Sequence, residues 1–319
     1  MAFSLVLVVV GLIGLYLGGD LLVRGASRIA TTLGLSPLAI GLTVVAVGTS
    51  APELLVNSLA AFRGANGMAL GNVIGSNIAN IGLILGITGL VAAITVQSSV
   101  VKRDIPIMIG ATLLVAITTA NGKIGRIEGA IMVLAFIAYT TYTYRQAHSS
   151  QADIPLDDDI SPATINRTNE IIRFVAGVGL LAVGAQLLVV GAEDIAHTLG
   201  ISDVVIGITI VAFGTSLPEL TSSITAAREG KTEMALGNVV GSNIANLLLV
   251  LGVTTLIAPI VIEPGQMRFG FISALVFSLF LFPLARDRVF SRRESVLLLV
   301  AYLIFLALVL FWLVPMAQS

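Results

Sequence analysis

The chain alternates between long apolar runs and short polar stretches. Runs long enough to cross a bilayer, about 17 to 25 residues, fall near residues 3–23, 37–62, 69–94, 104–120 and 127–144, and again near 171–192, 203–227, 235–260, 268–285 and 295–315. Between the two sets lies a polar stretch that contains four aspartates and two prolines. The pattern predicts an all-α membrane protein with ten spans, five in residues 1–145 and five in residues 170–319, joined by a linker at residues 146–169.

Composition supports this class and excludes others. Of the 319 residues, 56% are hydrophobic and 11% are charged, and the mean hydropathy is +1.02, far from the range of soluble proteins. The net charge of -1 gives no basic excess for a nucleic-acid partner. The expected partners are the lipid bilayer and small cations. Cysteine is absent, which excludes disulfides and thiolate metal sites. The first apolar run starts at Ala2 without a basic segment before it, so we expect a retained helix and not a signal peptide.

The number of spans and the distribution of basic residues predict an orientation. Because five is odd, the second half must enter the membrane from the opposite side, which makes the two halves inverted repeats. If both termini lie outside, about 13 of the 17 Lys and Arg residues fall in inner loops and about 4 in outer loops, as the positive-inside rule requires. We therefore expect a multi-pass protein of the cell membrane with both termini outside and the linker in the cytoplasm.

The two halves also share a sequence. The motif Gly-Thr-Ser-x-Pro-Glu ends at Glu53 and again at Glu219, and each copy is followed by Gly-Asn-Val-x-Gly-Ser-Asn-Ile-Ala-Asn. Aligned without gaps, residues 36–86 and 202–252 are identical at roughly 30 of about 51 positions, which indicates a tandem duplication. A carboxylate at bilayer depth costs about 2.5 to 3.5 kcal/mol. Two glutamates at matching positions therefore indicate a site for a cation or a proton.

Hydroxyl groups accompany each glutamate. Thr49 and Ser50 precede Glu53 by four and three residues, which places all three side chains on one helical face. Pro52 lacks an amide hydrogen and should break the helix there, and the carbonyls freed by the break, with Ala46 among the candidates, could bind a cation. The second copy repeats the arrangement with Ala212, Thr215, Ser216, Pro218 and Glu219.

A polar stripe follows in the third span, where Asn72, Ser76 and Asn80 recur every fourth residue, and in the eighth, where Asn238, Ser242 and Asn246 do so. Carboxylate, carbonyl, amide and hydroxyl oxygens together suit hard cations such as Ca²⁺ or Na⁺. The glycines of the same spans, Gly71, Gly75, Gly237 and Gly241, are better explained by close packing of helices.

Charge counting suggests a mechanism. Two ionised glutamates carry -2, which one Ca²⁺, several Na⁺ or two protons can compensate. Ions that compete for one carboxylate pair exchange by antiport if the site crosses between inward and outward access only when its charge is compensated. The first and sixth spans have no interior carboxylates and many glycines, so they either move or are simply closely packed.

The paired motifs resemble the two alpha repeats of the sodium/calcium exchanger family, within the calcium/cation antiporters. The resemblance implies ten helices as two inverted five-helix repeats, with broken helices 2, 3, 7 and 8, first and sixth helices that slide, and exchange of several Na⁺ for one Ca²⁺ without a cofactor. The implied ligands, matched by motif position, are Glu53, Glu219, Thr49, Thr215, Ser50, Ser216, Ala46, Ala212, Ser76, Ser242, Asn80 and Asn246.

The resemblance leaves coupling open. Some relatives, including potassium-dependent exchangers, have Asp where this chain has Asn246, so a potassium requirement is not expected here. Proton-coupled relatives share much of the signature, which leaves a Ca²⁺/H⁺ antiporter as the alternative. A cation channel fits poorly, because we expect a protein that functions as a monomer and carries an inverted repeat with two central carboxylates. The spans hold no Ser-His, paired Asp or His-Glu-x-x-His constellation, so an enzyme is not expected.

Overall fold

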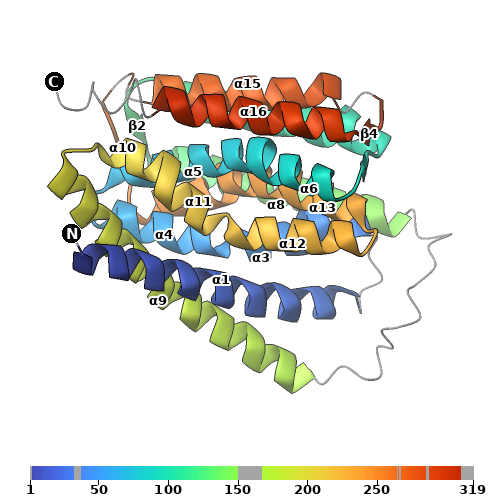
Figure 1. Cartoon of the computed structure of the whole chain (residues 1–319), viewed down its shortest axis with the longest axis horizontal. Coiled ribbons are helices and arrows are strands. Elements are labelled where there is room, and N and C mark those ends of the chain that lie inside the picture. The colour runs from blue at the N-terminus through green and yellow to red at the C-terminus, as the bar shows by residue number, and fades with distance from the viewer. Residues whose placement is uncertain are drawn as a thin grey trace.

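The computed structural model describes residues 2–31, 37–149, 167–263, 265, 267–284 and 287–309, and these residues are mostly helical. In Figure 1, α1 (Ala2–Thr31) and α9 (Arg167–Leu199) lie on one side of the bundle, and α15 (Arg268–Leu284) and α16 (Arg292–Leu308) lie on the opposite side. Helix α8 (Arg126–Ser149) continues into the linker expected at 146–169, and α9 begins inside it. The rest of the expected linker, 150–166, lies outside the described residues.

The two halves contain the same elements in almost the same order. After α1, the first half contains α2 (Pro37–Ile40), the π-helical turn η1 (Gly41–Val45), α3 (Ala46–Thr49), α4 (Ala51–Phe62), α5 (Asn66–Ala79), the π-helical turn η2 (Asn80–Ile84), α6 (Leu85–Val91), β1 (Ile94–Thr95), the π-helical turn η3 (Val100–Asp104), α7 (Ile105–Thr118), β2 (Lys123–Ile124) and α8. After α9, the second half contains α10 (Asp203–Ile206), η6 (Gly207–Val211), α11 (Ala212–Thr215), α12 (Leu217–Arg228), α13 (Thr232–Ala245), η7 (Asn246–Val250), α14 (Leu251–Ile257), β3 (Ile260–Val261), α15, β4 (Val289–Phe290) and α16. Elements from η1 to β1 recur in the second half at a spacing of 166 residues.

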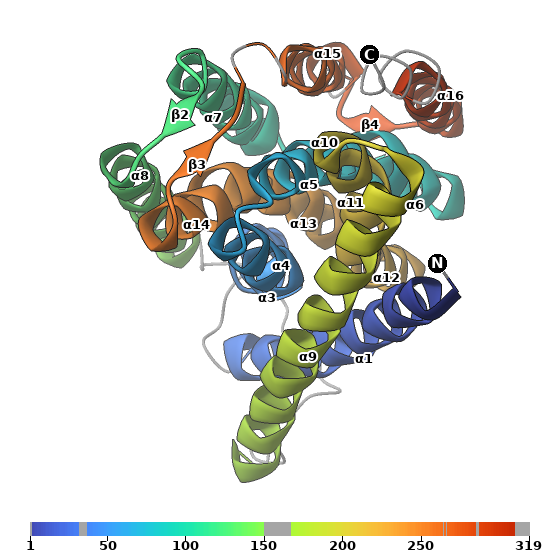
Figure 2. The same cartoon turned by 90° about the vertical axis from the view of Figure 1, so that its left-hand side faces the viewer.

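The halves are interleaved. Helix α5 of the first half packs against α10 and η6 of the second, while α13 of the second half packs against α2 and η1 of the first. The short antiparallel strand pairs also join the halves, because β1 pairs with β4 and β2 with β3. Figure 2 shows α4, α5, α11 and α13 in the middle of the bundle, with α1 and α9 crossing beside them. The repeated motifs therefore meet at the centre.

Glycines allow this close approach. A Cβ atom on Gly75 of α5 would lie 2.5 Å from the carbonyl oxygen of Ile208 in η6, and one on Gly241 of α13 would lie 2.8 Å from that of Leu42 in η1. Such distances leave no room for a side chain. These glycines therefore serve helix packing, as the sequence suggested.

The helices that carry the motifs are interrupted in two ways. At Ser50 the backbone turns to φ -80°, ψ 5°, and at Ser216 to φ -83°, ψ 5°. The helical segment Asp203–Thr215 is bent by 41° relative to α12 at this point. In Asn66–Val91 and Thr232–Ile257 the helix is continuous and contains a π-helical turn at Asn80 or Asn246. The breaks expected in helices 3 and 8 are thus wide turns, because neither segment contains a proline to remove a helical donor.

Five of the described helices are long and apolar enough to span a membrane, or six if the bent pair Asp203–Thr215 and Leu217–Arg228 counts as one span. The five are Leu38–Phe62, Asn66–Val91, Arg126–Gln146, Val175–Ala196 and Thr232–Ile257. Each coincides with an expected span. The spans expected near 3–23, 104–120, 268–285 and 295–315 are not among them, so the number ten stays a prediction.

Candidate cation-binding site

Each glutamate lies in the first turn of the helix that follows the interruption. Glu53 is in the first turn of α4 and Glu219 in that of α12, each directly after a proline. The first amides of a helix lack intrahelical acceptors and carry partial positive charge, which helps to accommodate a buried carboxylate. The motif therefore brings a negative group and a helix N-terminus to the same point.

The two motifs face each other across the halves. Ser50 Oγ lies 3.4 Å from Glu219 Oε1, and Ser216 Oγ lies 3.3 Å from Glu53 Oε1. Each glutamate thus accepts from the serine of the opposite motif. Glu53 Oε1 also lies 3.5 Å from Ser76 Oγ of α5. The structure brings the two carboxylates to one site although they are far apart in sequence.

Both carboxylates are incompletely satisfied. Glu53 and Glu219 are each 0% exposed, and the Oε2 atom of each has no hydrogen-bond partner among the described residues. A buried ionised carboxylate without a partner is costly, because its lost hydration is not replaced. If both carboxylates are ionised, the pair therefore requires compensating positive charge.

The two threonines also contact residues of the opposite half. Thr49 Oγ1 lies 3.2 Å from both Asn238 Oδ1 and Ser242 Oγ of α13. Thr215 Oγ1 lies 3.1 Å from Asn72 Oδ1 and 3.5 Å from Ser76 Oγ of α5. The polar stripe of each half therefore meets the hydroxyl groups of the other half.

The carbonyls of Ala46 and Ala212 differ from the expectation. The amide of Ser50 donates to the carbonyl of Ala46 at 3.0 Å, and the amide of Ser216 donates to that of Ala212 at 3.2 Å. The helix remains hydrogen-bonded here because the proline lies two residues later and removes the donor for a different carbonyl. These oxygens still lie among the site hydroxyls, since Ser76 Oγ is 3.5 Å from the carbonyl of Ala212.

Two supporting residues were not singled out in the sequence. Asn57 accepts from Asn72 Nδ2 at 3.0 Å, and Ser223 accepts from Asn238 Nδ2 at 3.0 Å. Both are fully buried. The signal was their position four residues after each glutamate, on the same helical face.

Asn80 and Asn246 begin the two π-helical turns, and their side chains are buried. Asn80 donates through Nδ2 to Asn243 Oδ1 at 2.9 Å, and its own Oδ1 has no partner among the described residues. In Asn246 both Nδ2 and Oδ1 are without a partner in the described part of the chain. Both amides therefore keep a buried side-chain oxygen without a partner in the described part of the chain.

The whole set is enclosed and made of oxygen ligands. The twelve candidate residues have exposed fractions between 0% and 3%. Among the described residues, no three His, Cys, Asp or Glu side chains are placed so that they could hold a metal ion together. Two carboxylates among hydroxyls and amides fit Na⁺ or Ca²⁺.

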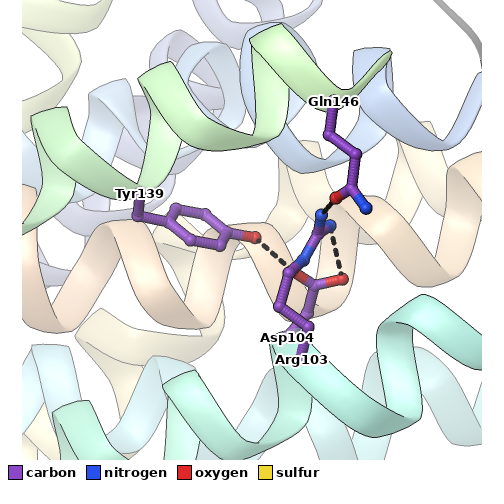
Figure 3. A network of polar contacts seen from close by, with 4 residues as sticks. All are labelled: Arg103, Asp104, Tyr139 and Gln146. Carbon is purple, nitrogen blue, oxygen red and sulfur yellow. Dashed lines mark hydrogen bonds and ion pairs between the residues drawn. The ribbon is translucent and has the colours of Figure 1, made fainter. Parts of the chain in front are cut away.

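A third buried carboxylate has a different role. Asp104 is 0% exposed and receives hydrogen bonds from Arg103 at 2.7 and 2.9 Å and from Tyr139 at 3.2 Å. Arg103 also contacts Gln146 near the end of α8, as Figure 3 shows. Asp104 is thus paired, and the network anchors the start of α7 to α8.

Comparisons with known proteins find relatives over nearly the whole chain. The family model for the sodium/calcium exchanger protein matches residues 3–145 and 170–311. The putative antiporter CaxA of Alkalimonas amylolytica is 40% identical, over 95% of this chain and 97% of its own length. The sodium/calcium exchanger MaX1 of Methanosarcina acetivorans is 33% identical, over 97% and 99%. A solved structure of the sodium-calcium exchanger NCX_Mj, soaked with Na⁺ and Sr²⁺, has a TM-score of 0.70 and 35% identity, covering 96% of this chain and 98% of that one.

Proposed function

Because this chain belongs to the sodium/calcium exchanger family, whose members are cation antiporters, we propose that it exchanges Na⁺ for Ca²⁺ across the cell membrane. The observation that carries the proposal is the pair of buried glutamates, one from each half, whose Oε2 atoms have no partner among the described residues. Two named sodium/calcium exchangers, MaX1 and NCX_Mj, match nearly the full chain, which supports Na⁺ and Ca²⁺ as the ions.

The site would use oxygens from both halves. Glu53 and Glu219 supply the negative charge, and hydroxyl, amide and carbonyl oxygens supply neutral ligands. The neutral ligands are Thr49, Thr215, Ser50, Ser216, Ser76, Ser242, Asn80, Asn246 and the carbonyls of Ala46 and Ala212. Their burial and mutual contacts support a single shared site. No cofactor is needed, because the transported ions provide the compensating charge.

Exchange follows from charge compensation. The empty site holds -2, and moving that charge through a low-dielectric interior is costly. One Ca²⁺ or several Na⁺ remove this cost, so the loaded site can change its side of access and the empty site cannot. Calcium leaving on one side must therefore be replaced by sodium before the site returns.

The fold proposed for this motion has ten helices in two inverted five-helix repeats. The 166-residue spacing of the elements and the strand pairs between the halves support it. Helices α1 and α9 contact each other through glycines, with a Cβ atom on Gly11 only 2.7 Å from the amide nitrogen of Leu188. A close backbone contact without intervening side chains suits two helices that slide together past the site. Both termini outside, a cytoplasmic linker and a functional monomer complete the proposal.

A Ca²⁺/H⁺ antiporter is the second candidate, because the same pair of glutamates is compatible with it. The unpartnered Oε2 atoms of Glu53 and Glu219 could each carry a proton in place of a shared cation. The ligand chemistry allows both couplings, so the driving ion must be tested directly.

Reconstituted vesicles separate the candidates. Vesicles loaded with Na⁺ and diluted into Na⁺-free medium with radioactive Ca²⁺ should accumulate Ca²⁺ at equal pH and equal K⁺ on both sides. Uptake only under a pH gradient would establish proton coupling instead. Uptake without any counter-ion would indicate a channel and overturn antiport. Empty vesicles provide the background.

A further inference from the structure

Four buried asparagines at the centre form a nearly symmetric set. Asn77 and Asn80 of the first half correspond to Asn243 and Asn246 of the second, at the 166-residue spacing of the repeat. All four are at most 4% exposed. Asn77 Nδ2 donates to the carbonyl of Asn243 at 3.3 Å, and Asn243 Nδ2 donates to the carbonyl of Asn77 at 3.4 Å. These reciprocal bonds join the two halves.

A second pair of bonds breaks this symmetry. Asn80 Nδ2 donates to Asn243 Oδ1 at 2.9 Å. The equivalent bond would run from Asn246 Nδ2 to Asn77 Oδ1, and it is not made. Both atoms that would form it are buried and have no partner in the described part of the chain. The Asn80 amide is therefore held by a hydrogen bond from its Nδ2 atom, whereas the equivalent groups of Asn246 and Asn77 are present but do not form a bond.

The bond that is made orients a candidate ligand. An amide whose Nδ2 is held has its carbonyl oxygen fixed in direction. Held by Asn243, the Asn80 amide keeps Oδ1 free of protein partners and available to a cation. Asn246 lacks such a bond, so its amide must be ordered when an ion binds, which weakens binding.

Asn243 makes one further contact in this conformation. Asn243 Nδ2 also lies 3.4 Å from the thioether sulfur of Met108, which is fully buried. The position equivalent to Met108 is Ala274, whose side chain accepts no hydrogen bond. Asn243 therefore has an additional anchor that Asn77 lacks.

We propose that Asn77 and Asn243 are positioning residues that hold the ligand amides of Asn246 and Asn80 in alternation. Asn243 holds Asn80 in the conformation described here. In the conformation in which the inverted halves exchange their roles, Asn77 holds Asn246 and the Asn80 bond is released, so that each arrangement serves access from one side. The proposal rests on the proposed antiport function. In each access state one ligand amide, that of Asn80 or that of Asn246, is held by a hydrogen bond and the other is not.

Transport measured from each face tests this. In sealed membrane vesicles of both orientations, Asn243→Ala should raise the KM for Ca²⁺ about fivefold from one face, the effect of one lost hydrogen bond, and change it less than about twofold from the other. Asn77→Ala should do the same from the opposite face. Thr88→Val, which alters another buried polar residue outside the site, is the control and should leave both KM values unchanged.

A conservative variant separates orientation from packing and charge. Asn243→Asp keeps an oxygen that can accept from Asn80 Nδ2, so it should bring the KM on the affected face back toward the wild-type value. An added negative charge acting by itself would lower the KM equally from both faces, and that result would overturn the proposal. Equal loss of Vmax from both faces at unchanged KM, the effect of a purely structural role, would also overturn it.

The result also distinguishes this proposal from the proposed function. If the wild-type protein shows no Na⁺-driven Ca²⁺ exchange, the function is wrong. If the wild-type protein exchanges the ions and both alanine variants act on the same face, the function stands and the alternation of the two asparagines is wrong.

Discussion

Replacing Glu53 by glutamine tests the site with little change in shape. The variant removes one negative charge and keeps an oxygen that can accept from Ser216 Oγ and Ser76 Oγ, which lie 3.3 and 3.5 Å from Glu53 Oε1. Repulsion between Glu53 and Glu219 in the ion-free protein is also relieved. We therefore expect Glu53→Gln to fold and, without ions, to be at least as stable as the wild type.

Ion binding should be strongly weakened in the same variant. Removing one partner from a buried charge interaction costs about 3 to 5 kcal/mol, which corresponds to at least a hundredfold increase in the Kd for Ca²⁺. At a Ca²⁺ concentration of about 100 times the wild-type Kd, binding stabilises the wild type by about 2.7 kcal/mol. The variant, with its Kd raised about a hundredfold, would gain only about 0.4 kcal/mol.

Thermal unfolding in detergent, with and without Ca²⁺, measures this difference. Glu229→Gln is the matched control, because the Glu229 side chain is 56% exposed and pairs with Lys231 at 3.4 Å on the surface. The control should keep the wild-type shift in Tm on addition of Ca²⁺. If Glu53→Gln keeps that shift too, the glutamate does not bind the ion and the reasoning fails.

Three further predictions concern packing, anchoring and orientation. Gly184→Ala places a Cβ atom 2.8 Å from the backbone of α1 and should lower the free energy of unfolding by about 1 to 3 kcal/mol. Gly179→Ala is the control, because a Cβ atom there has no atom within 4 Å and should not lower the free energy of unfolding. Equal Tm values for the two variants would contradict this prediction. Asp104→Asn should destabilise by about 2 kcal/mol in denaturant unfolding, and an unchanged midpoint would remove the anchoring role. The chain lacks cysteine, so a single introduced cysteine reports the side on which it lies. In right-side-out vesicles treated with an impermeant thiol reagent, Lys102→Cys should be shielded and Lys123→Cys should react. The reverse pattern would show that the orientation is inverted.

The sequence contains the repeat and indicated that its two motifs would lie close together. Duplicated glutamates with flanking hydroxyls indicate a shared site because a polar group in an apolar run needs a partner. In the structure Ser50 and Ser216 approach the glutamate of the opposite half. The glycines at 75 and 241 were assigned to packing, and they contact backbone atoms of η6 and η1.

Other features depend on three-dimensional detail that spacing does not encode. The carbonyl of Ala46 keeps its helical donor, since one proline removes one particular bond and the position of the break decides which. Asn57 and Ser223 support the stripe amides of their own halves, and they differ between the copies, so the repeat did not mark them. The unequal bonds of Asn80 and Asn246 arise from packing around two nearly identical sequences.

The central claim is that Glu53 and Glu219 bind one cation between them. Diffraction from crystals of the protein soaked in Sr²⁺, a divalent cation heavy enough to locate by anomalous scattering, tests it most directly. We predict a single strong peak within coordination distance of both carboxylates, and its loss in Glu53→Gln crystals. A peak that contacts neither glutamate, in protein that still exchanges Ca²⁺, would contradict the account.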